Sequence, residues 1–195
     1  MGHEWTAGQL GAAHTGRPGA LLPDGTEPGP VYYDIGSGSH VPSTTQWDAY
    51  DGTLGAPRAS HVRAVCSCGW RGDKLYKLDW DRIAEAGGAA FADMSGPRGD
   101  WARHSEEVVA RMAPLPPALE ALLVQLHDQV CALADDAPLS ALRAVAAVER
   151  TAREAGRRAA YGVEARDLPD TDVATALGLS ESTARSVLLG YALRE

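Results

Sequence analysis

Apolar residues in the second half of the chain recur at helical spacing. Six of them fall at i, i+3, i+4, i+7, i+11 and i+14, namely Leu119, Leu122, Leu123, Leu126, Val130 and Leu133. This spacing predicts an amphipathic helix with one apolar stripe. Pro138 marks a break, after which a second helix is expected to run to about Tyr161. The outer side of that helix carries five arginines: Arg143, Arg150, Arg153, Arg157 and Arg158.

The first half has a different pattern, in which short segments of β-branched and aromatic residues alternate with turn residues. Three such segments are predicted to be strands of a small antiparallel sheet, and the second is expected to end in an Asp-Gly turn. These segments cover residues 31–33, 46–52 and 61–66. Two helices are expected after them, a short one opening at residues 79–83 and a firmer one between residues 99 and 112.

Three prolines, at positions 114, 116 and 117, mark a domain boundary because they cannot continue a helix. The predicted fold class is therefore α+β, with a β-rich module over residues 31–113 and a helical domain over residues 114–195. Residues 1–30 are rich in Gly, Pro and Thr and have almost no apolar periodicity. We expect them to form a disordered or extended arm.

The net charge, the apolar content and the number of cysteines exclude several classes of protein. The net charge is −8, which argues against a general nucleic-acid binder, because neutralising phosphates requires clustered Lys and Arg. Any contact with DNA must come from a local basic face. The sequence contains neither an apolar run long enough to span a membrane nor the pattern of a signal peptide, so we expect a cytoplasmic protein. Three cysteines are too few for a disulfide scaffold.

Residues 173–188 have the sequence features of two short helices joined by a sharp turn. Gly178 lies at the turn, where a positive φ costs little only for glycine, and Ser180 is placed to cap the second helix. Ala174 is small enough for the two helices to approach closely. We expect Leu179 to fill the turn from below, and Ala184 and Val187 to face Val173 and Leu177. The predicted element is a helix-turn-helix over residues 170–190.

Cys66 and Cys68 are separated by one residue and followed by glycine, as in one arm of many zinc knuckles. Zn²⁺ takes four S or N ligands in a tetrahedron, and with no second Cys-x-Cys arm, histidines must complete the set. His104 is the best candidate and His61 the next, although a regular strand would point His61 away from Cys66. His40 and Asp51 are weaker alternatives. The alternative interpretation is that both cysteines are buried thiols of the core.

His127 and Cys131 are four residues apart on the predicted long helix and could also hold a metal ion. No further ligand is evident nearby. We therefore favour a core cysteine beside a surface histidine.

Catalytic motifs such as Gly-x-Ser-x-Gly, His-Glu-x-x-His and Gly-rich phosphate loops are absent from the sequence. A zinc ion with three protein ligands and an open position for water is the one route to catalysis that the residues offer. The expectation is that the protein is not an enzyme.

The string Leu177-Gly178-Leu179-Ser180-Glu181-Ser182-Thr183-Ala184-Arg185 resembles the helix-turn-helix of sigma-factor region four and of LuxR-type response regulators. The resemblance implies that residues of the second helix face DNA (Ser182, Thr183, Arg185 and Ser186). The preceding arginine-bearing helix, with Arg153 and Arg157, looks like the support helix of similar actinobacterial modules. The Cys-x-Cys-Gly-Trp string resembles small actinobacterial zinc-binding modules.

Together these features predict a transcriptional regulator with a structural zinc ion. Double-stranded DNA is the expected partner, and a homodimer is a further expectation because such proteins commonly read two half-sites. The alternative is an adaptor that binds another protein and uses the helix-turn-helix only for packing.

Overall fold

The computed structural model describes residues 3–33 and 41–193, and it has the expected α+β class. The chain divides into two compact units, Met1–Ala110 and Arg111–Glu195. The first unit contains the β-strands of the described chain, and the second is built from helices.

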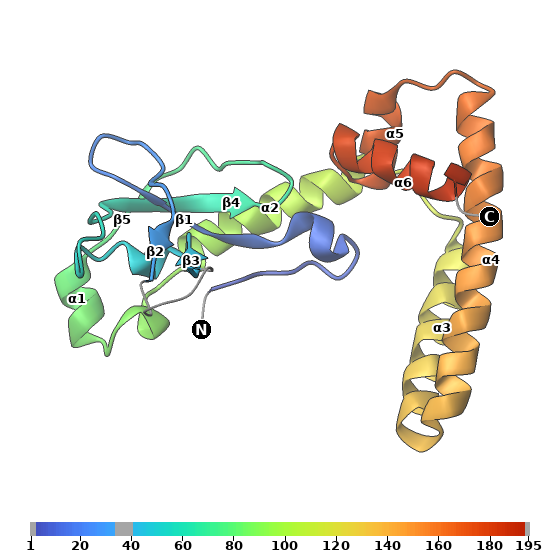
Figure 1. Ribbon diagram of the computed structural model, residues 1–195, viewed down its shortest axis with the longest axis horizontal. Coiled ribbons are helices and arrows are strands. Elements are labelled where there is room, and N and C mark those ends of the chain that lie inside the picture. The colour runs from blue at the N-terminus through green and yellow to red at the C-terminus, as the bar shows by residue number, and fades with distance from the viewer. Residues whose placement is uncertain (1–2, 34–40, 194–195) are drawn as a thin grey trace. The chain divides into compact units, whose positions relative to one another are not determined.

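A three-stranded antiparallel sheet organises the first unit, with the strand order β1 (Gly16–Leu21), β4 (His61–Cys66), β5 (Tyr76–Lys77) (Figure 1). In the register of β1 and β4, Gly16 lies opposite Cys66 and Leu21 opposite His61. A second, two-stranded sheet pairs β2 (Val31–Tyr32) with β3 (Ser43–Thr44). Three 3-10 helices complete the loops: η1 (Gly11–His14), η2 (Trp47–Ala49) and η3 (Ala89–Phe91).

Two α-helices follow the sheet in the first unit, α1 (Trp80–Glu85) and α2 (Ser95–Arg111). The carboxylate of Asp79 caps α1 by accepting a hydrogen bond from the backbone of Arg82 at 3.1 Å. Helix α2 is longer at its start than predicted, and its buried residues are Pro97, Trp101 and Ser105. The core of the unit is rich in aromatic side chains, since Trp5, Trp47, Tyr50 and Trp101 are all buried in it.

The first thirty residues differ from the disordered or extended arm that we expected, because Gly16–Leu21 is a buried strand of the sheet. The glycines of this segment permit close packing. A Cβ added at Gly16 would lie 2.5 Å from the ring of Trp101, and one at Gly19 would lie 2.5 Å from Val65. A high glycine content is here a requirement of the core rather than a sign of disorder.

Residues 46–52 were predicted to be a strand, and this is wrong: Trp47–Ala49 is a 3-10 helix. Trp47 and Tyr50 are 2% and 1% exposed. Two side chains three residues apart reach the same core from one turn of helix, whereas in a strand they would point to opposite faces. The other two predicted strands are confirmed by β2 and β4.

The second unit begins with two long helices, α3 (Pro117–Asp136) and α4 (Pro138–Glu164), which lie side by side as a hairpin (Figure 1). Each starts with a proline in its first turn, where the missing N–H is not needed. The break that we predicted at Pro138 is confirmed as the connection between them. No side chain of α3 is buried, and Ala141 is the buried residue of α4.

Helices α5 (Asp170–Leu177) and α6 (Glu181–Leu193) form the predicted corner. Gly178 has φ 63° and ψ 38°, the left-handed conformation expected at the turn. The Oγ of Ser180 accepts a hydrogen bond from the backbone N–H of Thr183 at 3.2 Å and so caps α6. The small core of the corner consists of Val173, Ala174 and Ala184, with Val163, Leu179 and Leu188 packed around it.

Two details of the corner differ from the prediction. Leu188, rather than Val187, packs against the core, and Leu177 is 41% exposed. Val163 at the end of α4 also packs against this core. The side of α6 that carries Leu188 therefore faces α4.

Candidate metal centre and helical corner

Four side chains that can bind a metal ion meet at one end of the sheet: His14, Cys66, Cys68 and His104. Their ligand atoms all lie within 4.8 Å of one another. His14 and Cys66 are buried, and Cys68 and His104 are half-buried. This cluster could hold a metal ion.

The distances within the cluster suit tetrahedral coordination. The Sγ of Cys66 lies 3.5 Å from Nδ1 of His14, and the Sγ of Cys68 lies 3.4 Å from Nε2 of His104. A tetrahedral zinc ion, with Zn–S near 2.3 Å and Zn–N near 2.0–2.1 Å, places a sulfur and a nitrogen ligand about 3.6 Å apart. These two sulfur–nitrogen pairs therefore have the spacing found around a bound zinc ion, and the four ligand atoms together lie close enough to hold an ion.

The two cysteines are positioned by the end of β4 and the turn that follows it. The N–H of Gly69 donates to the carbonyl of Cys66 at 3.0 Å, and the N–H of Cys66 donates to the carbonyl of Trp70 at 3.0 Å. Gly69 has a φ of 98°, a conformation that side chains rarely adopt. The turn brings both thiols to the same side, as the Cys-x-Cys-Gly spacing predicted.

His14 reaches the cysteines because β1 pairs with β4. Gly16 lies opposite Cys66 in the register, so the residues just before β1 pass the turn that carries the thiols. Ser67, between the two cysteines, holds the segment around His14 against the turn. Its Oγ donates to the carbonyl of Ala13 at 2.9 Å and accepts from the N–H of Thr15 at 2.9 Å.

Helix α2 supplies the fourth side chain. His104 lies one turn after Trp101, whose ring packs against Gly16 of β1 and so fixes the helix on the sheet. The imidazole of His104 stacks on the indole of Trp70, and its centroid lies 5.5 Å from that of the His14 ring. The cluster thus joins three segments that are distant in the sequence.

The electrostatics of the pair of thiols favour a positive partner. Burial raises the pKa of the Cys68 thiol, and the neighbouring Cys66 raises it further, whereas a backbone hydrogen bond from Trp70 lowers it. Two thiolates side by side repel each other, and a divalent cation removes this cost by binding both.

The candidate ligands from the sequence divide into two groups. The structure brings together Cys66, Cys68 and His104, but it places His61 at the opposite end of β4, roughly 16 Å along the strand at about 3.3 Å per residue. There the Nδ1 of His61 lies 2.9 Å from the Oγ of Ser60. The fourth member is His14, which the sequence interpretation assigned to an arm and did not consider.

The weaker alternatives do not join the cluster within the described residues. The carboxylate of Asp51 accepts hydrogen bonds from the N–H and the hydroxyl of Thr53, both at 2.7 Å, and so shapes a turn. His40 lies outside the described residues. Cys131 is exposed, which overturns the expectation of a core cysteine, and its Sγ lies 3.7 Å from Nε2 of His127.

The helical corner places all four predicted DNA-facing side chains of α6 on the exposed surface: Ser182, Thr183, Arg185 and Ser186. The Oγ of Ser180 lies within hydrogen-bond distance of the hydroxyls of Ser182 and Thr183, at 3.1 and 2.8 Å. The hydroxyl of Ser186 donates to the carbonyl of Ser182 at 2.9 Å. The first turns of α6 therefore present a polar, hydrogen-bonding surface.

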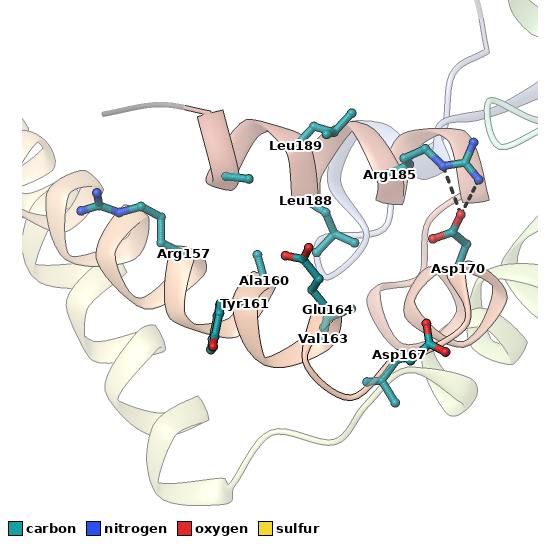
Figure 2. A pocket seen from close by; sticks show the side chains of 12 residues that line it. Arg157, Ala160, Tyr161, Val163, Glu164, Asp167, Asp170, Arg185, Leu188 and Leu189 are labelled. Carbon is teal, nitrogen blue, oxygen red and sulfur yellow. Dashed lines mark hydrogen bonds and ion pairs between the residues drawn. The ribbon is translucent and has the colours of Figure 1, made fainter.

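Arg185 is held by an ion pair across the corner. Its Nε donates to Oδ2 of Asp170 at 3.1 Å, and a second N–H donates to the same oxygen (Figure 2). This contact raises the pKa of Arg185. The pair lines one end of a groove of about 610 Å³ between α4 and α6, whose wall also includes Glu164 and Leu188.

The two arginines predicted on α4 differ in their surroundings. Arg153 forms an ion pair with Glu149 at 3.0 Å, one turn earlier on the same helix. Arg157 lines the groove, at the end opposite Arg185 (Figure 2). Of the two, Arg157 is therefore the one placed beside the corner.

The chain matches no known family model, no curated protein and no solved structure. In the part of the chain that the structure describes, none of the helices combines the length and the apolar character needed to cross a membrane. The features that bear on function are therefore the cluster of cysteines and histidines and the helical corner.

Proposed function

We propose that this protein is a cytoplasmic DNA-binding regulator whose N-terminal unit is stabilised by a structural zinc ion. The observation that carries the DNA-binding part is the corner of α5 and α6, in which Gly178 makes the turn and Ser180 caps a second helix with an exposed polar first turn. Helices joined in this way place the second one in the major groove of DNA.

The proposed zinc ion is supported by the kinds of side chain that form the cluster. Two cysteines and two histidines whose ligand atoms lie within 4.8 Å of one another are a donor set that zinc prefers, and softer or harder ions favour other sets. A site with four protein ligands leaves no open position for water, which supports a structural role. The ion would join η1, the end of β4 and α2 into one unit.

Metal analysis of matched histidine variants tests the zinc site. We expect the purified protein to hold one zinc ion per chain, His14→Ala to lose it, and His61→Ala to retain it. His61 is the matched control because it lies on the same sheet, away from the cluster. Equal retention of zinc by both variants, or equal loss, would refute the assignment of His14.

Arg185 is the side chain of α6 best suited to a contact with DNA. It is exposed and cationic, and it lies in the second turn of α6, a helix whose Ser182 and Ser186 are also exposed. The ion pair with Asp170 is solvent-exposed, so phosphate can compete for the guanidinium at little cost. Because the net charge is −8, the protein as a whole repels DNA, and attraction to phosphate must come from Arg185 and its neighbour Arg157.

Fluorescence anisotropy with a random-sequence 30-base-pair duplex pool tests DNA binding without knowledge of the target sequence. We expect binding at low salt that weakens steeply as salt rises, because counterions are released from the phosphates. Arg185→Ala should weaken binding across the whole pool and reduce the slope of the salt dependence by about 1, because it removes one phosphate contact. Arg98→Ala removes an exposed arginine of the other unit and should have little effect.

An adaptor that binds a protein is the second candidate, and the Arg185–Asp170 pair is the observation that favours it. In an adaptor, Arg185 would only stabilise the packing of α5 against α6 through its ion pair with Asp170. The absence of duplex binding by the folded, zinc-loaded protein at low salt would refute the regulator and favour the adaptor.

A further inference from the structure

The hairpin of α3 and α4 exposes large apolar side chains along both of its helices. We call this surface the hairpin face and define it by six residues: Leu119, Leu122, Leu123, Leu126, Leu142 and Val145. Leu122 is 60% exposed and Leu142 is 66% exposed. Helix α3 has 20 residues, and none of them is buried. The stripe that predicted an amphipathic helix therefore has no complete cover within the second unit.

The exposed apolar residues lie mainly on one side of α3. The spacing of Leu119, Leu122, Leu123 and Leu126 confines them to one arc of the helix, and charged Asp128 lies on the opposite arc. Two helices alone form a single layer, and a stable domain needs a second layer over its apolar side. Large apolar side chains gathered on one exposed side of an element are typical of interaction surfaces.

The charges of the two helices are complementary. Helix α3 carries four acidic residues and neither Lys nor Arg: Glu120, Asp128, Asp135 and Asp136. Helix α4 carries five arginines against three glutamates. A second hairpin turned by a two-fold axis brings the acidic α3 of each copy beside the basic α4 of the other. The two helices are thus opposite in charge, which suits an isologous interface that places α3 of one copy beside α4 of the other.

The dimensions of the hairpin face also suit a dimer. A helix of 20 residues is about 30 Å long, and two helices side by side are roughly 20 Å wide, which gives about 600 Å² in projection. Side-chain relief increases the accessible area above the projected value. This is of the same order as the ~800 Å² that each partner contributes to a standard interface.

We infer that a second copy of this chain covers the hairpin face, so that two hairpins form a four-helix bundle in which α3 of each copy packs beside α4 of the other. Packing of this kind buries the leucine stripe and pairs the acidic helix with the arginine-bearing one. The inference is independent of DNA binding, because it concerns a different surface of the second unit.

Sedimentation equilibrium of the full zinc-loaded chain tests this inference. We expect a mass of twice 20.5 kDa for the unaltered protein. Leu122→Asp should produce monomers, because it puts a charge in the centre of the hairpin face. Val124→Asp is the matched control: Val124 is 62% exposed on the same helix but lies off the stripe. It should remain dimeric.

Charge-reversed chains test the arrangement without altering the apolar stripe. The variant Arg143→Glu/Arg150→Glu and the variant Glu120→Lys/Asp136→Lys should each dimerise at least tenfold more weakly, and an equimolar mixture should restore dimers, because Glu120 and Asp136 flank the stripe of α3. Circular dichroism checks that each variant stays helical.

Three outcomes would overturn the inference: a monomeric unaltered protein at 100 μM or more, dissociation by Val124→Asp equal to that by Leu122→Asp, or a mixture that stays monomeric. A monomer in which hydrogen exchange of α3 is protected would show instead that another part of the same chain covers the face. A dimer that binds no duplex would refute the proposed regulator and leave this inference standing.

Discussion

The imidazole of His104 lies flat on the indole of Trp70, with ring centroids 4.3 Å apart and planes only 5° apart. The stack fixes the ring plane of His104 and therefore the direction of its nitrogen toward Cys68. Side chains that hold a metal ligand in its orientation without binding the ion themselves affect metal affinity strongly. Trp70 is thus a positioning residue of the candidate metal centre.

Replacement of Trp70 by alanine should weaken zinc binding about tenfold, measured by competition with a chromophoric chelator. Trp70→Phe keeps an aromatic surface beside His104 and should stay closer to the unaltered affinity. Equal affinities for the alanine variant and the unaltered protein would show that the stack plays no part in holding the ligand.

Ser67 should affect zinc binding although it is not a ligand. Its hydroxyl connects the turn of the cysteines to Ala13 and Thr15, on either side of His14. Ser67→Ala releases this segment and should weaken zinc affinity by about tenfold in the same competition assay. Ser60→Ala, at the far end of β4, is the control and should leave the affinity unchanged.

Gly16 should tolerate no side chain. A Cβ at this position would lie 2.5 Å from the ring of Trp101, so Gly16→Ala should lower the free energy of unfolding of the first unit by about 1–3 kcal/mol. Urea denaturation followed by tryptophan fluorescence measures the loss. A Cβ at Gly29 meets no atom within 4 Å, and Gly29→Ala should change stability by less than about 0.5 kcal/mol.

Tyr76 should make the first unit less stable at alkaline pH. Burial, and the hydrogen bond that its hydroxyl donates to Asp100 at 2.6 Å, raise the pKa of Tyr76 to about 12. The phenol of the unfolded chain ionises near pH 10, so its contribution to stability is complete below pH 10 and is lost as pH rises toward 12.

The free energy of unfolding, measured in urea between pH 8 and 12, should fall less steeply for Tyr76→Phe than for the unaltered protein. Burial also raises the pKa of Tyr50, so part of the decline should persist in this variant. Tyr161→Phe, at an exposed position of the other unit, is the control. An identical decline in Tyr76→Phe and in the unaltered protein would contradict the prediction.

Asp170 should restrain DNA binding by holding Arg185. Asp170→Asn removes the charge that competes with phosphate, and an exposed ion pair is worth at most about 1 kcal/mol, so affinity for duplex DNA should rise by up to about fivefold. Anisotropy with the duplex pool measures the change. A loss of affinity would mean that the pair braces the corner in its binding conformation.

The helical corner could be predicted in detail because its determinants are local. Gly178, Ser180 and the small residues Ala174 and Ala184 specify a turn, a cap and a close approach within fifteen residues. Leu188 was missed because its partner Val163 belongs to a different helix. Sequence spacing alone does not reveal which side of α6 faces α4.

The metal centre could be predicted only in part. Cys66 and Cys68 carry a recognisable spacing, and His104 follows an aromatic residue on a helix that was itself predicted. His14 depends on the pairing of β1 with β4, a contact across 52 residues, and its strand is hidden among glycines and prolines. The sequence feature that could have indicated this ligand is a single histidine two residues before Gly16, a glycine that the close approach of Trp101 requires.

The order of the four ligands along the chain has a consequence for biosynthesis. A separation of 52 residues divides His14 from Cys66, and 36 divide Cys68 from His104. The ligand set is therefore incomplete on the ribosome until α2 has been made, and the strands β1 and β4 can pair before any ion is fully enclosed. A chain that stops short of α2 would carry three of the four candidate ligands, so capture of the proposed ion would mark a completed N-terminal unit.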